Sequence, residues 1–171
     1  DIAYSVGALY ANAENYTEAK KYFQRAVQVN PSNTNAKEAL LDMNEVISQN
    51  NVQDAAKLVE EQKYDEALSL LNKALTDNPK NADAYYYRAS VYDAQNKPQL
   101  AVNDYKKSLE FNNNQDVTYY LIAIDYDNMN NLTSALEYYK KFINVYKTDD
   151  EYSQYVKARI PEIESTIEQE K

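Results

Sequence analysis

The chain has 171 residues, with 18 Lys and Arg against 27 Asp and Glu, which gives a formal net charge of −9. This charge repels a phosphate backbone, so we expect no nucleic-acid partner. The sequence contains no Cys, no His and one Gly, which excludes Ser-His and Cys-His nucleophile pairs, zinc sites of Cys or His, and glycine-rich phosphate loops. We therefore expect no enzyme activity, no cofactor and no metal.

The scarcity of Gly and Pro favours long helices joined by short turns over a sheet with tight hairpins. Apolar residues at helical spacing predict helices at 2–13, 16–29, 34–48, 52–62, 65–77, 82–95, 98–111, 116–129, 132–146 and 150–168. No apolar run approaches the ~18 residues of a membrane span. The sequence begins at Asp1 without a Met, so the absence of a signal segment leaves the compartment open between the cytoplasm and a bacterial envelope.

Eight of these helices form four pairs that share one pattern of side-chain sizes, at steps of three, nine, four and three residues. Steps of three or four keep residues on one helical face, and the step of nine crosses a polar bend. The pattern therefore predicts helical hairpins that stack on one another to bury their apolar faces. The positions are Gly7, Tyr10, Ala19, Phe23 and Ala26; Ala55, Leu58, Ala67, Leu71 and Ala74; Ala89, Tyr92, Ala101, Tyr105 and Ser108; and Ala123, Tyr126, Ala135, Tyr139 and Phe142.

The last three pairs follow one another at a constant interval, which runs from Ala55 to Ala89 and from Ala89 to Ala123. Pro31 and Pro79 close the first two pairs. This pattern resembles the tetratricopeptide repeat, a helical pair of ~34 residues with small, aromatic and closing proline positions. Asn113 stands where a closing proline is expected in the third pair. The resemblance implies an all-α, right-handed superhelical solenoid of antiparallel helix pairs, with about ten helices in this chain.

The first and second pairs are farther apart than this constant interval, so an extra segment lies between them. We predict that this segment forms an amphipathic helix over 34–48. The helix is either a cap that ends before Asn50 or the first part of one long helix that continues into 52–62. The polar stretch Ser48-Gln49-Asn50-Asn51 and the acid at Asp54 favour the break. The expected domains are a first hairpin at 1–33, an extra helix at 34–48, three hairpins at 49–149 and a capping helix at 150–171.

In the resembled family the first helix of each pair lines a concave groove that holds a peptide or another protein. By position in the repeat, the groove candidates here are Tyr4, Asn12, Tyr86, Ser90, Asp93, Tyr120, Ile124, Asp127 and Asn128. These side chains are tyrosines, small residues and acids, so we expect none of the basic carboxylate clamps of some family members. Arg88 is expected to point into helix packing. A Tyr-rich, acidic-edged groove suits a protein or peptide with apolar and basic residues.

An adaptor or scaffold with such a groove is the function that we expect, and we expect a monomer that does not insert into a membrane. The alternative is a structural or self-associating segment of a longer repeat array. Acid-base or calcium chemistry would need carboxylates such as Asp116, Asp125 and Asp127. We expect these carboxylates to lie on solvated faces or at helix N-termini instead, because their spacing lacks the glycine of a calcium loop.

Overall fold

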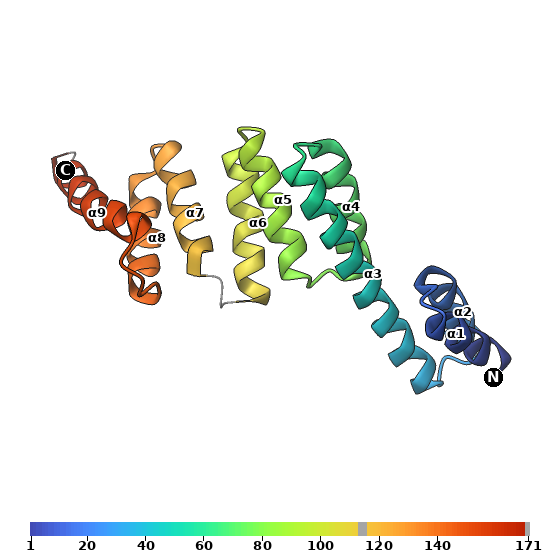
Figure 1. Ribbon diagram of the computed structural model, residues 1–171. Coiled ribbons are helices and arrows are strands. Elements are labelled where there is room, and N and C mark those ends of the chain that lie inside the picture. Colours follow the sequence, from blue (N-terminus) through green and yellow to red (C-terminus); the bar gives the residue numbers. More distant parts are fainter. Residues whose placement is uncertain (113–115, 170–171) are drawn as a thin grey trace. The chain divides into compact units, whose positions relative to one another are not determined.

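The computed structural model describes residues 1–112 and 116–169, and every secondary-structure element in these residues is a helix (Figure 1). The expected all-α class is therefore confirmed, with nine helices in the described residues where about ten were expected. The helices are α1 Ile2–Asn12, α2 Tyr16–Val29, α3 Thr34–Glu60, α4 Tyr64–Asp77, α5 Ala82–Ala94, α6 Pro98–Phe111, α7 Asp116–Asn128, α8 Leu132–Val145 and α9 Glu151–Gln169. The turn around Asn113 lies outside the described residues.

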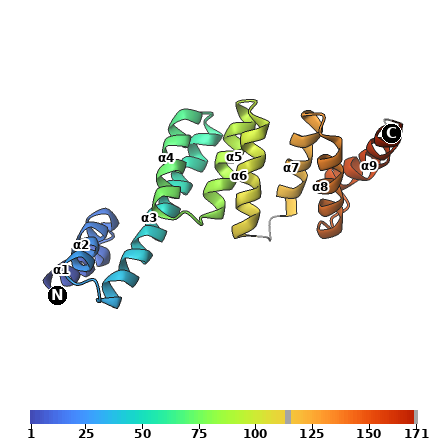
Figure 2. The ribbon, with the colours of Figure 1, turned by 180° about the vertical axis from the view of Figure 1, so that it is seen from behind.

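The chain divides into two compact units, Asp1–Asn81 and Ala82–Lys171. The first unit contains α1 to α4 and the second contains α5 to α9, and the helices of each unit pack as neighbours in chain order. Figure 2 shows the same helices from behind. None of the helices in the described residues combines the length and the apolar character needed to cross a membrane.

The turn of each of the four helix pairs contains one residue with a positive φ of 56° to 59°. These residues are Glu14, Gln62, Asn96 and Asn130. After each of them, a backbone N–H bonds back to the carbonyl five residues earlier, as in Asn131 to Tyr126 at 2.8 Å and Lys63 to Leu58 at 2.8 Å. This is the hydrogen-bond pattern of a Schellman motif, which satisfies the last carbonyls of a helix. The same turn therefore recurs in every pair, and it explains the constant nine-residue step.

In the first unit, the single glycine allows α1 and α2 to approach closely. Gly7 is buried, and a Cβ built on it would lie 2.8 Å from ring carbons of Phe23. Carbon atoms at that distance overlap, so only Gly fits without a shift of the ring. The ring of Phe23 in turn lies 5.5 Å from that of Tyr4.

Helix α3 is continuous over 27 residues, so the expected break before Asn50 is wrong. It packs against both α2 and α4, and in Figure 1 it runs as one rod beside both. Two physical reasons explain the continuity. The extra segment adds close to four whole turns at ~3.6 residues per turn, so the apolar stripe stays in phase. The polar stretch also has a tertiary role, because buried Ser48 accepts a hydrogen bond from the side chain of Asn81 at 2.9 Å.

The second unit has a core of small and aromatic residues contributed by all of its helices, with Tyr105, Tyr139 and Phe142 almost fully buried. The final helix, expected at 150–168, is confirmed as α9. It packs against α8 and buries Val156 and Ile163 in the same core. The positions singled out by the repeat therefore form the packing surface of this unit.

Candidate partner-binding face of the second unit

The groove candidates of the second unit lie on α5 and α7. Tyr86, Ser90 and Asp93 lie on α5, and Tyr120, Ile124, Asp127 and Asn128 lie on α7; we call these seven residues the α5–α7 face. All except the exposed Asn128 are partly buried. The two remaining candidates, Tyr4 and Asn12, lie on α1 in the first unit.

The two tyrosines of the α5–α7 face pack against rings of neighbouring helices. Tyr86 lies edge-on to Tyr105 at 5.7 Å between ring centroids, and its burial raises the pKa of its hydroxyl. Tyr120 contacts Phe142 and also Tyr152 and Tyr155 of α9, at 5.2 and 6.3 Å for the last two. The repeat pattern did not predict that α9 would share in covering Tyr120, because α9 lies outside the four matched pairs.

Asp127 is held by a cation from the same chain. The Nε and one terminal nitrogen of Arg159 on α9 donate to its two oxygens, each at 2.8 Å, and the hydroxyl of Tyr139 donates at 3.1 Å. The Arg159 hydrogen bonds lower the pKa of the Asp127 carboxyl. This bidentate pair between α7 and α9 stabilises the end of the unit, because a charge-assisted fork is stronger than a neutral hydrogen bond.

Asp93 is the repeat equivalent of Asp127, but it faces a second carboxyl group instead of a cation. The hydroxyl of Tyr105 donates to Asp93 Oδ2 at 2.8 Å. The other oxygen, Oδ1, is buried, and so is Oδ2 of Asp125 on α7; neither has a donor among the described residues. The two carboxyl groups hydrogen-bond to each other when one of them carries a proton.

The Asp93–Asp125 pair binds its shared proton more tightly than an ordinary carboxyl group does. Burial and the neighbouring Asp93 raise the pKa of Asp125 to about 8, and burial also raises the pKa of Asp93. Asp125 is only 6% exposed, so the expectation that it lies on a solvated face is wrong. Two adjacent buried carboxyls cannot both ionise without a large electrostatic cost.

Arg88 points into helix packing, as expected. Its Nε donates to Asp104 of α6 at 2.6 Å and a terminal nitrogen donates at 2.9 Å. The ion pair joins the two helices of the third pair, and it leaves the α5–α7 face acidic near Asp93.

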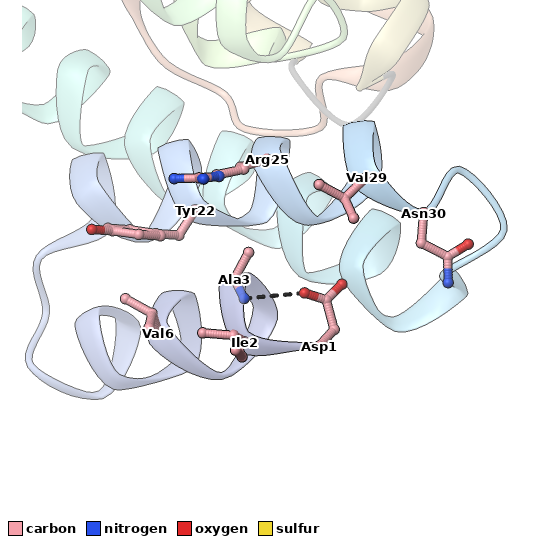
Figure 3. A pocket seen from close by; sticks show the side chains of 8 residues that line it. All are labelled: Asp1, Ile2, Ala3, Val6, Tyr22, Arg25, Val29 and Asn30. Carbon is pink, nitrogen blue, oxygen red and sulfur yellow. Dashed lines mark hydrogen bonds between the residues drawn. The ribbon is translucent and has the colours of Figure 1, made fainter.

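A separate pocket of about 540 Å³ lies in the first unit, between α1 and α2 (Figure 3). Apolar side chains such as Ile2, Val6 and Val29 line it together with Tyr22 and Arg25. Ile2 is 85% exposed and Val29 is 73% exposed. The outer face of the first hairpin is therefore open and partly apolar.

Comparison with solved structures places this fold among known helical-repeat domains. One is the first TPR of Spaghetti (RPAP3) bound to the HSP90 peptide SRMEEVD, at a TM-score of 0.63 and 19% identity, covering 72% of this chain and 94% of that chain. A second is the Sgt2 TPR domain from Aspergillus fumigatus, at 0.59 and 19%, with 71% and 80% covered. A third is PilF of Pseudomonas aeruginosa, at 0.62 and 20%, with 96% and 84% covered.

Among curated proteins, the chain is 41% identical over 56 residues to tetratricopeptide repeat protein 36 of Caenorhabditis elegans, covering 33% of this chain and 31% of that protein. It is 35% identical over 71 residues to the TPR repeat-containing thioredoxin TDX of Arabidopsis thaliana, covering 42% and 19%. The chain thus spans less than a third of the length of either relative.

Three family profiles, each described as a tetratricopeptide repeat, match residues 1–33, 58–103 and 118–149, and together they cover more than half of the chain. The matched segments contain the four recurrent turns, the first helical hairpin described above and nearly all of the fourth, with parts of the second and third. The chain therefore belongs to the tetratricopeptide repeat family.

Proposed function

We propose that this chain is a protein-interaction module, an adaptor or scaffold, and that the α5–α7 face holds a peptide segment of its partner. The observation that carries the proposal is the chemistry of this face. Partly buried tyrosines lie beside a small residue, Ser90, and beside Asp93, one of whose carboxyl oxygens has no donor among the described residues. Tyrosine offers a large contact area with few rotors to order, which suits peptide recognition.

The known repeat domains support this class of function. The RPAP3 neighbour is bound to the peptide SRMEEVD, which carries three acidic residues and one Arg. The α5–α7 face of our protein contains no Lys or Arg, and its Asp93 has no cation partner among the described residues, whereas Asp127 is paired with Arg159. Charge complementarity therefore favours a partner segment with apolar and basic residues over an acidic one.

Peptide display against the purified chain tests the proposal. We expect selection of a common motif that combines apolar and basic residues. A Ser90→Trp variant places a bulky ring on the α5–α7 face and should lose the motif. An Asn103→Trp variant places the same ring at an exposed position of α6 and should keep it. No enriched motif, or equal retention by both variants, would contradict peptide binding at this face.

The outer face of the first hairpin supports a second candidate function, the self-association of a repeat array. Helical repeats bury apolar faces by stacking on a neighbour, and the Figure 3 pocket exposes Ile2 and Val29. If this face stacks on another copy, sedimentation equilibrium should show a concentration-dependent dimer. A Val29→Glu variant should then be monomeric, and a native chain that stays monomeric at all concentrations would exclude the candidate.

A further inference from the structure

Two positions around the acidic groups of the second unit recur from the third helix pair to the fourth, one repeat apart. Asp93 corresponds to Asp127, and Tyr105 corresponds to Tyr139. In both copies the tyrosine hydroxyl donates to the aspartate, at 2.8 and 3.1 Å. The repeat therefore builds the same carboxylate–tyrosine arrangement twice.

A third position separates the two copies. Arg159 supplies the cation that holds Asp127, and the residue one repeat before Arg159 is Asp125. Where the fourth pair receives a guanidinium, the third pair receives a second carboxyl group. The titratable groups that face this carboxyl pair are Tyr105 of α6 and, near Asp93, Tyr86 of α5. Neither of these two tyrosines carries a positive charge that could neutralise the carboxyl pair.

The environment of Asp125 also indicates that a ligand binds beside this carboxyl pair. Its side chain is buried, and its Oδ2 has no donor among the described residues. Asp93 beside it is only partly buried, so the pair lies at the edge of the α5–α7 face and not in the middle of the core. Ionisation of both buried carboxyls is costly while no cation lies beside them, and a bound cation would offset that cost.

We propose that the Asp93–Asp125 pair is the anchor site for one arginine side chain of the partner peptide. This inference rests on the proposed function. A guanidinium has five donors in a flat fork and is more weakly hydrated than an ammonium group, so it can bond two adjacent carboxylates at once. The ion pair at Asp127 shows that this chemistry fits the repeat.

The equivalent ion pair shows that a guanidinium can contact a recessed carboxylate of this repeat, where it comes from the chain position that Asp125 holds in the third pair. The side chain of Arg159 is 32% exposed while that of Asp127 is 10% exposed, so the guanidinium reaches a recessed carboxylate from a partly exposed position. In the Asp93–Asp125 pair, the arriving cation takes the place of the shared proton, which passes to solvent. Arginine binding should therefore strengthen as the pH rises from 6 to 8, since the cation and the proton compete.

Carboxyl-carbon NMR with the full chain tests the site directly, with N-acetyl-arginine amide as the probe. We expect saturable shifts at Asp93 and Asp125 and a fall of about one unit or more in the pKa of Asp125, as an adjacent cation produces. The matched control is N-acetyl-citrulline amide, which has nearly the same shape without the charge. Equal shifts with both probes, or no saturable shift at either carboxyl, would overturn the inference.

An Asp125→Asn variant removes one of the two charges and should weaken arginine-amide binding by about tenfold or more. It should also abolish the dependence of binding on pH. An Asp149→Asn variant, which changes an exposed acid, should bind as the native chain does. Unchanged binding by the Asp125 variant would place the arginine elsewhere and overturn the inference.

Peptide display separates this inference from the function on which it rests. A selected motif with one required Arg, lost with the Asp125→Asn variant, supports both. A motif that contains no Arg, or in which Lys serves equally, overturns the arginine site and leaves peptide binding intact. If no motif is selected, the proposed function fails, and the arginine-amide titration alone decides whether the carboxyl pair binds a guanidinium.

Discussion

Replacement of Asp125 by Asn should make the second unit more stable, and increasingly so as the pH rises. The native carboxyl has its pKa raised to about 8 by burial and by Asp93, whereas an unfolded Asp titrates near ~3.9. Between these values the folded state binds more protons than the unfolded state, so the free energy of unfolding falls with rising pH. The contribution of Asp125 is therefore complete below the unfolded pKa and is lost up to pH 8.

The magnitude follows from the linkage relation, whose limit for one group is about 1.4 kcal/mol per pH unit. The carboxamide of Asn donates to Asp93 Oδ1 without needing a proton. We expect little difference between the variant and the native chain at pH 5. Over the three pH units up to pH 8 this limit allows about 4 kcal/mol, and solvent screening of the partly exposed pair reduces it, so we expect a stabilisation of about 2–4 kcal/mol at pH 8.

Urea unfolding followed by circular dichroism at pH 5, 6, 7 and 8 measures this effect, with amide exchange in α7 as a local readout. Asp127→Asn is the matched control, because Arg159 lowers the pKa of Asp127 and the sign is reversed. That control should destabilise the unit by a similar amount from pH 5 to pH 8, because the native carboxylate stays ionised over this range. A parallel pH dependence in the Asp125 variant and the native chain would refute the reasoning.

Three further substitutions probe the helix ends and the close approach of α1 and α2, each by the change in urea midpoint. Gln62→Gly should stabilise the chain by about 0.5–1 kcal/mol, because Gly adopts the positive φ of 59° without steric cost. Asn131→Ala should destabilise it by about 1 kcal/mol, because the Asn131 side chain caps α8 by accepting from the N–H of Ser134 at 3.2 Å. Gly7→Ala should destabilise it by about 1–2 kcal/mol despite the better helix propensity of Ala, because its Cβ would overlap the ring of Phe23. Adding Phe23→Leu should recover part of that loss, and no effect of Gly7→Ala would rule out the steric explanation.

The helical hairpins could be predicted because their packing positions follow one spacing that the backbone geometry enforces. Gly7, Tyr105 and Tyr139 were assigned to packing by that spacing, and the structure buries all three. The predicted break in α3 is wrong because polar residues can lie inside a helix when the fold gives them a partner. The side chain of Ser48 is in fact used by Asn81, and only the fold brings these two residues together.

The chemistry of the α5–α7 face was harder to predict because it depends on which helix lies opposite. The acid at position 93 was identified as a face residue, but its partner Asp125 was assigned to a solvated surface. The sequence does contain a sign of this pair, since Asp125 and Arg159 occupy positions one repeat apart and carry opposite charges. A comparison of charge at equivalent positions, beyond the packing positions, would have marked this pair.

Site-specific photo-crosslinking in the source organism tests whether a partner binds the α5–α7 face. A benzophenone side chain would be placed at Ser90 and at Asn128 on the α5–α7 face, and at Asn103 and Lys107 on α6. All four sites are at least partly exposed, so each can reach a bound protein. We expect the same crosslinked partner from the first two sites and none from the last two. Crosslinks from α6 alone, or crosslinks only to a second copy of the chain, would contradict partner binding at the α5–α7 face.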